Sequence, residues 1–355
     1  MKKILQLLWK MRELGAGRMH LREGYPPMIR VDGRLIAIDR PVLGGNELDA
    51  VLREICIPAR MEECLSEGHS AFMIRTEEGR FRVVLYRTTS GMALVFHELG
   101  SELPSFEDLG LPESLLEFTA LSSGLLLFSG PIGCGKTTTL HSLIARIQKE
   151  RPLHVITIEC PIEFHHEEGA GLIQQFEVGM HFRTFAEGVA MTERIRPDLL
   201  VVGDVRNAET LEGMLRAAES GVLVLASLHA GSSIQALSKL EELFPPCSRE
   251  AVRQRLAGSL RAVLCQVLVP KLYGRGELPA VEVLTCTEGV CERIRSGEFE
   301  GIGVLMEEGR GLGMATLDDA LFDLVARNLT GLDEALTFAM DKSRFEACRR
   351  ASPVL

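Results

Sequence analysis

Two periods of apolar residues alternate along the first hundred positions of the chain. Near the N-terminus the spacing is that of a helix, with apolar side chains three or four residues apart: Ile4, Leu7, Leu8, Met11 and Leu14. AFMIRTEEGRFRVVLYR and GMALVFHEL alternate with the period of strands, and PPMIRVDGRLIAI predicts a hairpin that turns at Asp32-Gly33. NELDAVLREICI and PARMEECLSEG predict two helices separated at Pro58. Residues 1–100 are therefore expected to form a small α+β domain.

A second pattern begins near residue 115, where short runs are almost entirely apolar: GLLLFSG, HVITIE, DLLVVGDV and VLVLASLH. Such runs are typical of strands buried on both faces of a mainly parallel sheet. Helical segments alternate with them, so residues 115–270 are expected to form an open α/β domain. SELPSFEDLGLP, with its two prolines, predicts an interdomain linker over residues 101–114. RQRLAGSLRAVLCQVL, LDDALFDLVARN and LDEALTFAM predict helices, and residues 271–355 are expected to be mostly helical.

Composition narrows the possible partners. The net charge of −10 argues against a protein that coats nucleic acid, because phosphate binding favours a basic surface. No apolar run approaches the roughly 18–20 residues that span a bilayer. The N-terminal apolar run ILQLLW is short and charges resume at Lys10 and Arg12, which favours an amphipathic helix packed on its own domain over an export signal. Nine cysteines without a CxxC pair indicate neither a zinc module nor a redox dithiol, and reduced, mostly buried thiols are expected.

A phosphate-binding loop is the strongest chemical signal, because GPIGCGKTT fits GxxxxGK[ST] between a predicted strand and a predicted helix. Its residues are Gly130, Pro131, Ile132, Gly133, Cys134, Gly135, Lys136, Thr137 and Thr138. The glycines let several backbone N–H groups point at one anion, and the helix start adds its positive end. Lys136 is expected to reach the β- and γ-phosphates, and the Thr137 hydroxyl to ligate Mg²⁺. A chance glycine-rich turn is the alternative; the lack of an NKxD motif favours ATP over GTP.

Two further strand ends carry candidate groups. LLVVGDVR ends near Asp204, where such folds place a carboxylate beside the metal or the attacking water, with plain strand termination as the alternative. VLVLASLH ends in His229, at the edge of the sheet where ligands bind, although packing or solvent exposure accounts for a lone histidine equally well. His165-His166 stand beside two glutamates, Glu167 and Glu168, and a solvated loop is favoured there over a metal site.

The chain resembles the secretion-type ATPases of type II secretion and type IV pili. GPIGCGKTTTL, VITIECPIEF, LLVVGDVR and LASLHAGSS occur in the order and spacing of that family. HLREGYPPMIRVDGRL, GRFRVVLYR, AAESGVLVLASLHA, LEELFP and GMATLDDAL are similar to the pilus retraction, or twitching-motility, branch. The likeness extends from about residue 20 to about residue 340. Relatives that drive pilus extension carry a zinc module of CxxC pairs, which this chain lacks, so no zinc is expected.

The resemblance implies a fold and a setting. It implies an N-terminal PAS-like α+β domain, a linker, a RecA-like P-loop ATPase domain and a helical C-terminal region, within an α/β fold class. It implies a homohexamer that binds ATP and Mg²⁺ at the domain junction and hydrolyses ATP to power pilus retraction. The ring is expected to be cytoplasmic and peripheral at the inner membrane, against a pilus platform protein. A paralogous retraction ATPase is a further expected partner, and nucleic acid is not.

Site residues carry over from the family at matching positions. In its acidic box, Glu159 and Glu163 match as catalytic carboxylates, while Cys160 replaces an aspartate. Asp204 stands where the catalytic glutamate is usual, and His229 is the histidine of the histidine box. The last matches lie in the N-terminal domain, where Arg80 and Arg82 correspond to arginines that approach the phosphates, with an exposed strand face as the alternative. Another departure is Cys291, at an arginine position of the retraction branch.

These departures leave three hypotheses open. Asp204 is one methylene shorter than glutamate, so its carboxylate falls about 1.5 Å short, and a misplacement of about 1 Å costs on the order of 10²-fold in rate. Cys160 is a soft and mostly neutral ligand where Mg²⁺ prefers oxygen, and no nearby cation activates it as a thiolate. The chain is expected to be a working but slow retraction motor. The alternatives are a weakly active or inactive accessory paralogue, or a motor for a related secretion-type machine.

Overall fold

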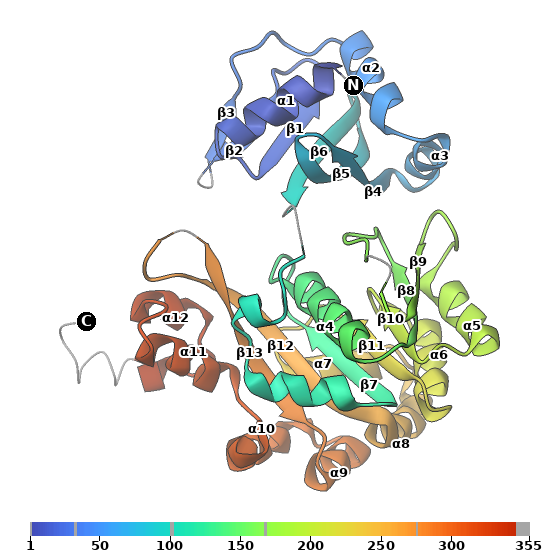
Figure 1. Cartoon of the computed structure of the whole chain (residues 1–355), viewed down its shortest axis with the longest axis vertical. Coiled ribbons are helices and arrows are strands. Elements are labelled where there is room, and N and C mark those ends of the chain that lie inside the picture. The colour runs from blue at the N-terminus through green and yellow to red at the C-terminus, as the bar shows by residue number, and fades with distance from the viewer. Residues whose placement is uncertain (1, 32–33, 100–102, 167–168, 275, 346–355) are drawn as a thin grey trace. The chain divides into compact units, whose positions relative to one another are not determined.

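The computed structural model describes residues 2–31, 34–99, 103–166, 169–274 and 276–345 of the chain. These residues divide into two compact units (Figure 1). The first unit comprises Met1–Leu103 with two short later segments, Cys160–His165 and Phe176–Arg183. The second comprises Pro104–Glu159, His166–Gln175 and Thr184–Leu355. Each unit has its own sheet and its own hydrophobic core.

The first unit is an α+β domain with a six-stranded antiparallel sheet in the order β3-β2-β1-β6-β5-β4. Its strands are β1 (Arg18–Arg22), β2 (Met28–Val31), β3 (Arg34–Ala37), β4 (His69–Thr76), β5 (Gly79–Thr88) and β6 (Gly91–Leu99). Its helices are α1 (Lys2–Glu13), α2 (Gly45–Ile55) and α3 (Pro58–Glu67). The predicted N-terminal helix is confirmed, since Ile4, Leu8 and Met11 of α1 pack into the core. The predicted turn at Asp32-Gly33 lies outside the described residues, but β2 and β3 pair as a hairpin.

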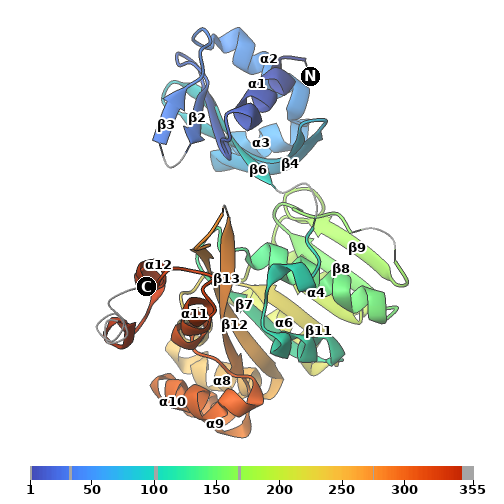
Figure 2. The ribbon, with the colours of Figure 1, turned by 60° about the vertical axis from the view of Figure 1, so that its left-hand side comes forward.

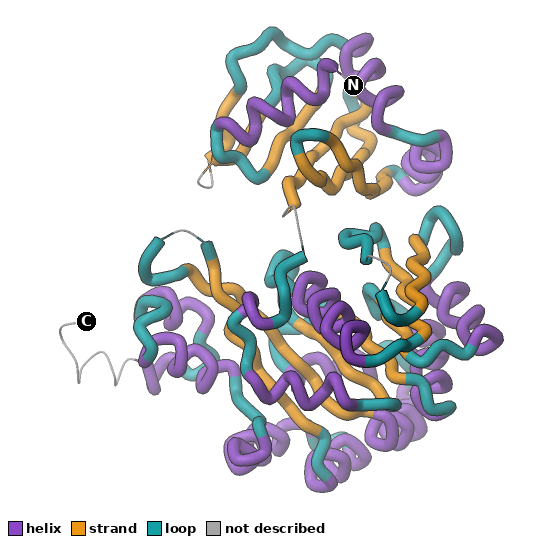
Figure 3. The backbone as a smooth tube through the Cα atoms, viewed as in Figure 1, coloured by secondary structure: helices purple, strands orange, loops and turns teal. Residues whose placement is uncertain are grey.

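The second unit is an α/β domain with a seven-stranded sheet in the order β13-β12-β7-β11-β10-β8-β9. Its strands are β7 (Gly124–Ser129), β8 (His154–Glu159), β9 (Leu172–Glu177), β10 (Leu199–Val202), β11 (Leu223–Ser227), β12 (Leu260–Pro270) and β13 (Glu277–Thr285). Its first helices are α4 (Lys136–Glu150), α5 (Phe185–Ile195), α6 (Ala208–Glu219), α7 (Ser233–Glu242) and α8 (Arg249–Ser259). The C-terminal helices are α9 (Glu288–Ser296), α10 (Ile302–Glu308), α11 (Leu317–Ala326) and α12 (Leu332–Phe338), which follow the last strand (Figure 3).

One predicted helix is wrong in its second half. RQRLAGSLRAVLCQVL is helical only as far as Ser259, and Leu260–Pro270 forms strand β12. This segment pairs with β7 on one side and with β13 on the other, as the long hairpin at the sheet edge in Figure 2 shows. A nearly continuous apolar run fits a buried helix and a doubly covered strand equally well, which explains the error. The predicted domain boundary at residue 270 falls at the turn of this hairpin.

Parallel pairing brings the chemically interesting strand ends together. Strands β7, β11, β10 and β8 are parallel neighbours, and almost every residue in them is buried, as predicted. Their carboxyl ends therefore meet at one edge of the sheet, where ligands bind in open α/β folds. In the described part of the chain, no helix combines the length and the apolar character needed to cross a membrane.

Candidate functional site

The phosphate loop joins β7 to α4 and has the backbone that its glycines predict. Gly130, Gly133 and Gly135 have φ angles of 143°, 80° and 84°, in a region that side chains disfavour. A Cβ atom on Gly130 would lie 2.3 Å from the carbonyl oxygen of Gln266, and one on Gly135 would lie 2.8 Å from its Nε2 atom. Glycine is therefore required for close packing as well as for curvature.

Lys136 opens α4 and folds back over the loop. Its Nζ atom donates hydrogen bonds to the carbonyl oxygens of Gly130 and Pro131, both at 2.8 Å. Lys136 is only 7% exposed, so its charge is held where the loop curves. Thr137 is half-buried in the first turn of the same helix. Of the remaining loop residues, Ile132 is exposed, Cys134 is buried and Thr138 is half-buried.

Gln266 braces the phosphate loop from β12 and was not predicted. Its Nε2 atom donates to the carbonyl oxygen of Cys134 at 2.7 Å, and its Oε1 atom accepts from the Thr139 hydroxyl at 2.8 Å. The side chain is buried, so both bonds form in a region that water does not reach. Its partners lie about 130 positions earlier in the chain, and its segment reads as a helix, so no local signal marks it.

His229 lies near both Lys136 and Asp204. Asp204 follows β10, and its Oδ2 atom accepts a 2.6 Å hydrogen bond from Nε of Arg206. His229 follows β11, with Nε2 4.0 Å from the same carboxylate oxygen and Nδ1 3.4 Å from the Lys136 ammonium. Burial and the charge of Lys136 lower the pKa of His229, while Asp204 acts in the opposite direction. The imidazole is therefore neutral at pH 7, and the structure brings these three predicted residues together.

Protein contacts hold the loop that carries His229 in place. Lys239 on α7 donates to the His229 carbonyl oxygen at 2.8 Å, and the Ser129 hydroxyl donates to the next carbonyl oxygen, that of Ala230, at 2.9 Å. The buried Glu282 on β13 accepts from both the backbone N–H and the hydroxyl of Ser233, each at 2.6 Å. The position of His229 is thus set by residues from three other elements.

Glu159 ends β8 and is enclosed by donors. Its carboxylate accepts from His141 Nε2 at 3.0 Å, from the Thr157 hydroxyl at 2.6 Å and from Gln175 Nε2 at 3.2 Å. Burial alone raises the pKa of Glu159, but the charge of His141 and the three hydrogen bonds bring it below the usual range. His141 stands four residues after Thr137, so it faces the same way from α4, one turn farther along. Glu159 therefore contacts α4 one turn beyond Thr137, the predicted metal ligand.

The predicted solvated loop at His165-His166 holds for His165, which is exposed, but the half-buried His166 joins the cluster around Glu159. Its Nε2 atom lies 2.7 Å from Nδ1 of His141, and the two rings stack with centroids 5.0 Å apart. The neighbouring Glu167 and Glu168 lie outside the described residues. Among the described residues, no group of three or more histidines, cysteines or acids is arranged to hold a metal ion. A histidine pair thus supports Glu159 through hydrogen bonds.

Glu163, Arg80 and Arg82 lie in the first unit, because Cys160–His165 packs there. Arg82 Nη1 is 3.3 Å from Oε1 of Glu163, and Arg80 Nη1 donates to the Glu163 carbonyl oxygen at 2.9 Å. The Arg80 guanidinium also lies 4.6 Å from the centre of the Phe164 ring. The two arginines predicted to approach phosphates thus contact the second acidic residue of VITIECPIEF.

Known proteins resemble the chain over nearly its full length. It is 33% identical over 333 residues to the type IV pilus retractation ATPase PilT of Pseudomonas aeruginosa, covering 94% of this chain and 96% of that protein. It is 31% identical to the type IV pilus ATPase PilU of the same organism, covering 94% of this chain and 88% of that protein. A crystal structure of the pilus retraction motor PilT with bound ADP superposes with a TM-score of 0.84 at 32% identity, covering 97% of this chain and 99% of that one.

The family model described as "Type II/IV secretion system protein" matches residues 57–307, which include the phosphate loop, both acidic strand ends and the histidine. This range covers most of the chain. The chain therefore belongs to the type II/IV secretion system protein family.

Proposed function

We propose that this protein is an ATPase that powers retraction of type IV pili. The observation that carries the proposal is the arrangement of Lys136, Asp204 and His229 around a complete phosphate loop, in a chain that matches PilT over nearly its whole length. The crystal structure of PilT with bound ADP supports nucleotide binding by the same fold.

The residues of the loop fit a triphosphate. Backbone N–H groups of a glycine-rich turn and the first turn of α4 favour an anion, and Lys136 supplies a charge held by two carbonyl oxygens. In the proposed complex, Lys136 exchanges those carbonyl oxygens for phosphate oxygens. Thr137 is the residue whose hydroxyl would hold Mg²⁺. When bound, Mg²⁺ would neutralise charge on the phosphates.

Asp204 is the proposed water-orienting carboxylate, and His229 its neighbour. The neutral imidazole offers one donor and one acceptor nitrogen without adding charge beside Lys136. Because Asp204 is short and accepts a hydrogen bond from Arg206, we expect its carboxylate to be displaced from the position a glutamate would reach. Glu159 and its two histidines hold the end of β8 against α4. Glu163 is proposed as a further catalytic carboxylate, and Arg80 and Arg82, which lie with it in the first unit, as phosphate-contacting arginines.

An accessory role is the second candidate, favoured by the Asp204–Arg206 pair and by Cys160 in place of an acid. Such a protein would bind ATP, join or modulate a ring of a more active relative, and hydrolyse little. The similarity to both PilT and PilU is compatible with either role. A motor for a related secretion-type machine would use the same site.

The expected assembly is a homohexamer without zinc, in the cytoplasm and peripheral at the inner membrane. Its expected partners are a pilus platform protein and a paralogous retraction ATPase. These proposals rest on the family, whose members include pilus ATPases of Pseudomonas aeruginosa.

The deciding experiment compares ATP turnover of the purified wild-type protein with that of Lys136→Ala, alongside pilus retraction in cells that carry either form. An active motor requires turnover well above the variant and loss of retraction in the variant cells. Turnover equal to that of Lys136→Ala, with retraction that still depends on the presence of the protein, would instead support the accessory role.

A further inference from the structure

A row of basic side chains crosses the sheet of the first unit. Arg30 on β2 pairs with Arg18 on β1, Arg18 pairs with His97 on β6, and His97 pairs with Arg82 on β5. Their neighbours along the strands, such as Ile29, Met19, Phe96 and Phe81, are buried in the core with α1. Since side chains alternate between the two faces of a strand, the basic row lies on the face opposite this core.

Further basic residues extend the row along the same face. Arg80 stands two positions before Arg82 and lies directly opposite Arg75 on β4. His20 stands two positions after Arg18. None of the described strand residues on this face is Asp or Glu, and the Glu163 carboxylate lies 3.3 Å from Arg82. We call this set the arginine face; its members are Arg18, His20, Arg30, Arg75, Arg80, Arg82 and His97.

The concentration of positive charge is unfavourable for the fold by itself. Like charges directly opposite each other on antiparallel strands are destabilising, and both Arg18–Arg30 and Arg75–Arg80 are such pairs. Burial, followed by the charges of Arg18, Arg82 and His20, lowers the pKa of His97 to about 4. Burial and Arg75 likewise lower the pKa of Arg80. A bound anion would relieve this repulsion.

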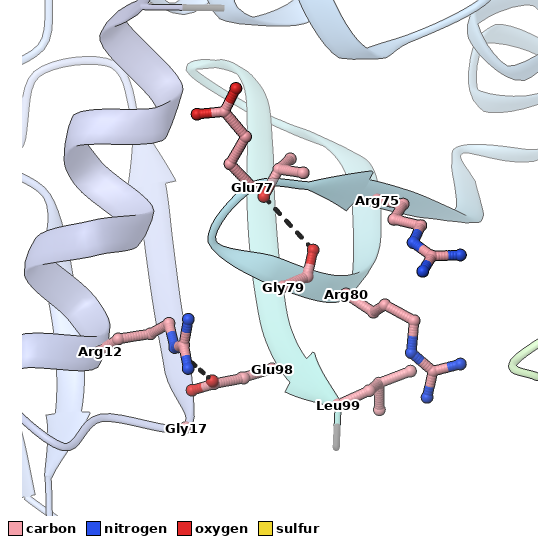
Figure 4. A pocket seen from close by; sticks show the side chains of 9 residues that line it. Arg12, Gly17, Arg75, Glu77, Gly79, Arg80, Glu98 and Leu99 are labelled. Atoms are coloured by element: carbon pink, nitrogen blue, oxygen red, sulfur yellow. Dashed lines mark hydrogen bonds and ion pairs between the residues drawn. The ribbon is translucent and has the colours of Figure 1, made fainter. Parts of the chain in front are cut away.

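A pocket of about 540 Å³ opens at one end of the arginine face. In Figure 4 the side chains of Arg75 and Arg80 extend side by side, while Glu77 points away from both guanidinium groups. On the other wall Arg12 is paired with Glu98 at 2.9 Å. The volume falls within the range of roughly 300–1,000 Å³ that is usual for small-molecule sites.

We propose that the arginine face and this pocket bind a small polyanion that carries two or more phosphate groups. Guanidinium groups match phosphate oxygens in pairs, and the long arginine side chains on paired strand residues can converge on one polyphosphate. The net charge of −10 opposes binding of long nucleic acids or anionic membranes, whereas a small ligand interacts mainly with the local field. Arg80 and Arg82 also belong to the proposed nucleotide site, so Arg18 and Arg75 serve as the test residues.

The experiment titrates inorganic tripolyphosphate into full-length Lys136→Ala protein by calorimetry, because this background weakens binding at the phosphate loop. Changing Arg18→Gln and Arg75→Gln together is expected to weaken the remaining binding by about tenfold or more, since each lost charge-assisted hydrogen bond accounts for about that factor. Arg327→Gln, which removes the same charge from an exposed site beyond α11, is the control and should have no effect. The double variant should melt at the same temperature as its parent or higher, because repulsion has been removed.

Absence of binding, or equal binding by the double variant, would overturn the proposal. A second arm measures binding of the protein to vesicles that contain anionic phospholipid. Vesicle binding that requires Arg18 and Arg75 but is not inhibited by tripolyphosphate would show that this face binds a membrane surface instead. ATP turnover of the wild-type protein is measured in parallel. A protein that binds tripolyphosphate through these arginines but hydrolyses no ATP contradicts the proposed function and leaves the anion site standing.

Discussion

The phosphate side and the acidic side of the candidate site are built in different ways. The phosphate side is a continuous loop of nine residues, Gly130–Thr138, braced by one buried glutamine. The acidic side consists of Glu159, Asp204 and His229, which follow the ends of three strands. Each of these residues already contacts another side chain: His141, Arg206 and Lys136, respectively. The loop matches the P-loop pattern in full, whereas the family resemblance leads us to expect departures on the acidic side, at Asp204 and Cys160. Binding and hydrolysis are therefore expected to respond separately to mutation.

The largest expected effect is the difference between Asp204→Ala, which should reduce turnover, and Lys136→Ala, which should reduce ATP affinity. Asp204→Ala should lower ATP turnover by about 10²–10³-fold, as does loss of one preorganised catalytic group, and should change ATP affinity by no more than about threefold. Lys136→Ala should weaken ATP affinity by about tenfold to a hundredfold, because a charge-assisted contact is lost. Turnover and nucleotide affinity measured on both variants check this split. Equal loss of affinity in both variants would mean that the two sides are not separable.

The next effect concerns the brace of the phosphate loop. Gln266→Ala removes hydrogen bonds to Cys134 and Thr139 and should weaken ATP affinity by about tenfold, because it leaves buried partners unsatisfied. Equilibrium binding of a fluorescent ATP analogue measures this, with the exposed Gln174→Ala as the matched control. Unchanged affinity in Gln266→Ala would show that the glycines alone determine the loop.

Cys160→Asp should restore part of the acidic side. Returning a charged oxygen ligand should raise turnover a few-fold, because Mg²⁺ prefers oxygen ligands to sulfur. Cys247→Asp, at an exposed cysteine, is the control for an added acid elsewhere. A fall in turnover for Cys160→Asp with no change in folding would contradict the interpretation of Cys160 as a missing carboxylate.

The smallest effect is the pH dependence of stability. The pKa of Glu159 is lowered in the folded state, so its contribution is present above the unfolded pKa of 4.5 and is lost as pH falls through the folded value. The free energy of unfolding of the wild type should therefore fall more steeply than that of Glu159→Gln between about pH 5 and pH 3. Urea titrations at each pH measure the two slopes. Parallel slopes would mean that His141 does not stabilise the charged carboxylate.

How far the sequence could predict the molecule depends on how local each signal is. The phosphate loop is contiguous, and its glycines have local causes, so its position and backbone follow from the sequence. The apolar runs likewise predict β7, β8, β10 and β11. The sequence does not predict strand β12, because a continuous apolar run has no period that distinguishes a strand from a helix. The role of Gln266 cannot be predicted either, because it depends on this strand. His141 and His166 were not recognised as partners, because only the folded chain places them 2.7 Å apart. The row of basic side chains across the first sheet cannot be predicted from the sequence, because it depends on which strand residues pair.

ATP affinity and turnover of Asp204→Glu, measured beside the wild type, show whether the short side chain of Asp204 limits hydrolysis. We expect Asp204→Glu to have the same ATP affinity within about threefold and a turnover higher by about tenfold to a hundredfold, because the added methylene carries the carboxylate about 1.5 Å farther. Equal or lower turnover in Asp204→Glu, in a protein whose wild type is far more active than Lys136→Ala, would contradict it. Asp204 would then be a fully placed catalytic acid, and the acidic side would not limit the rate.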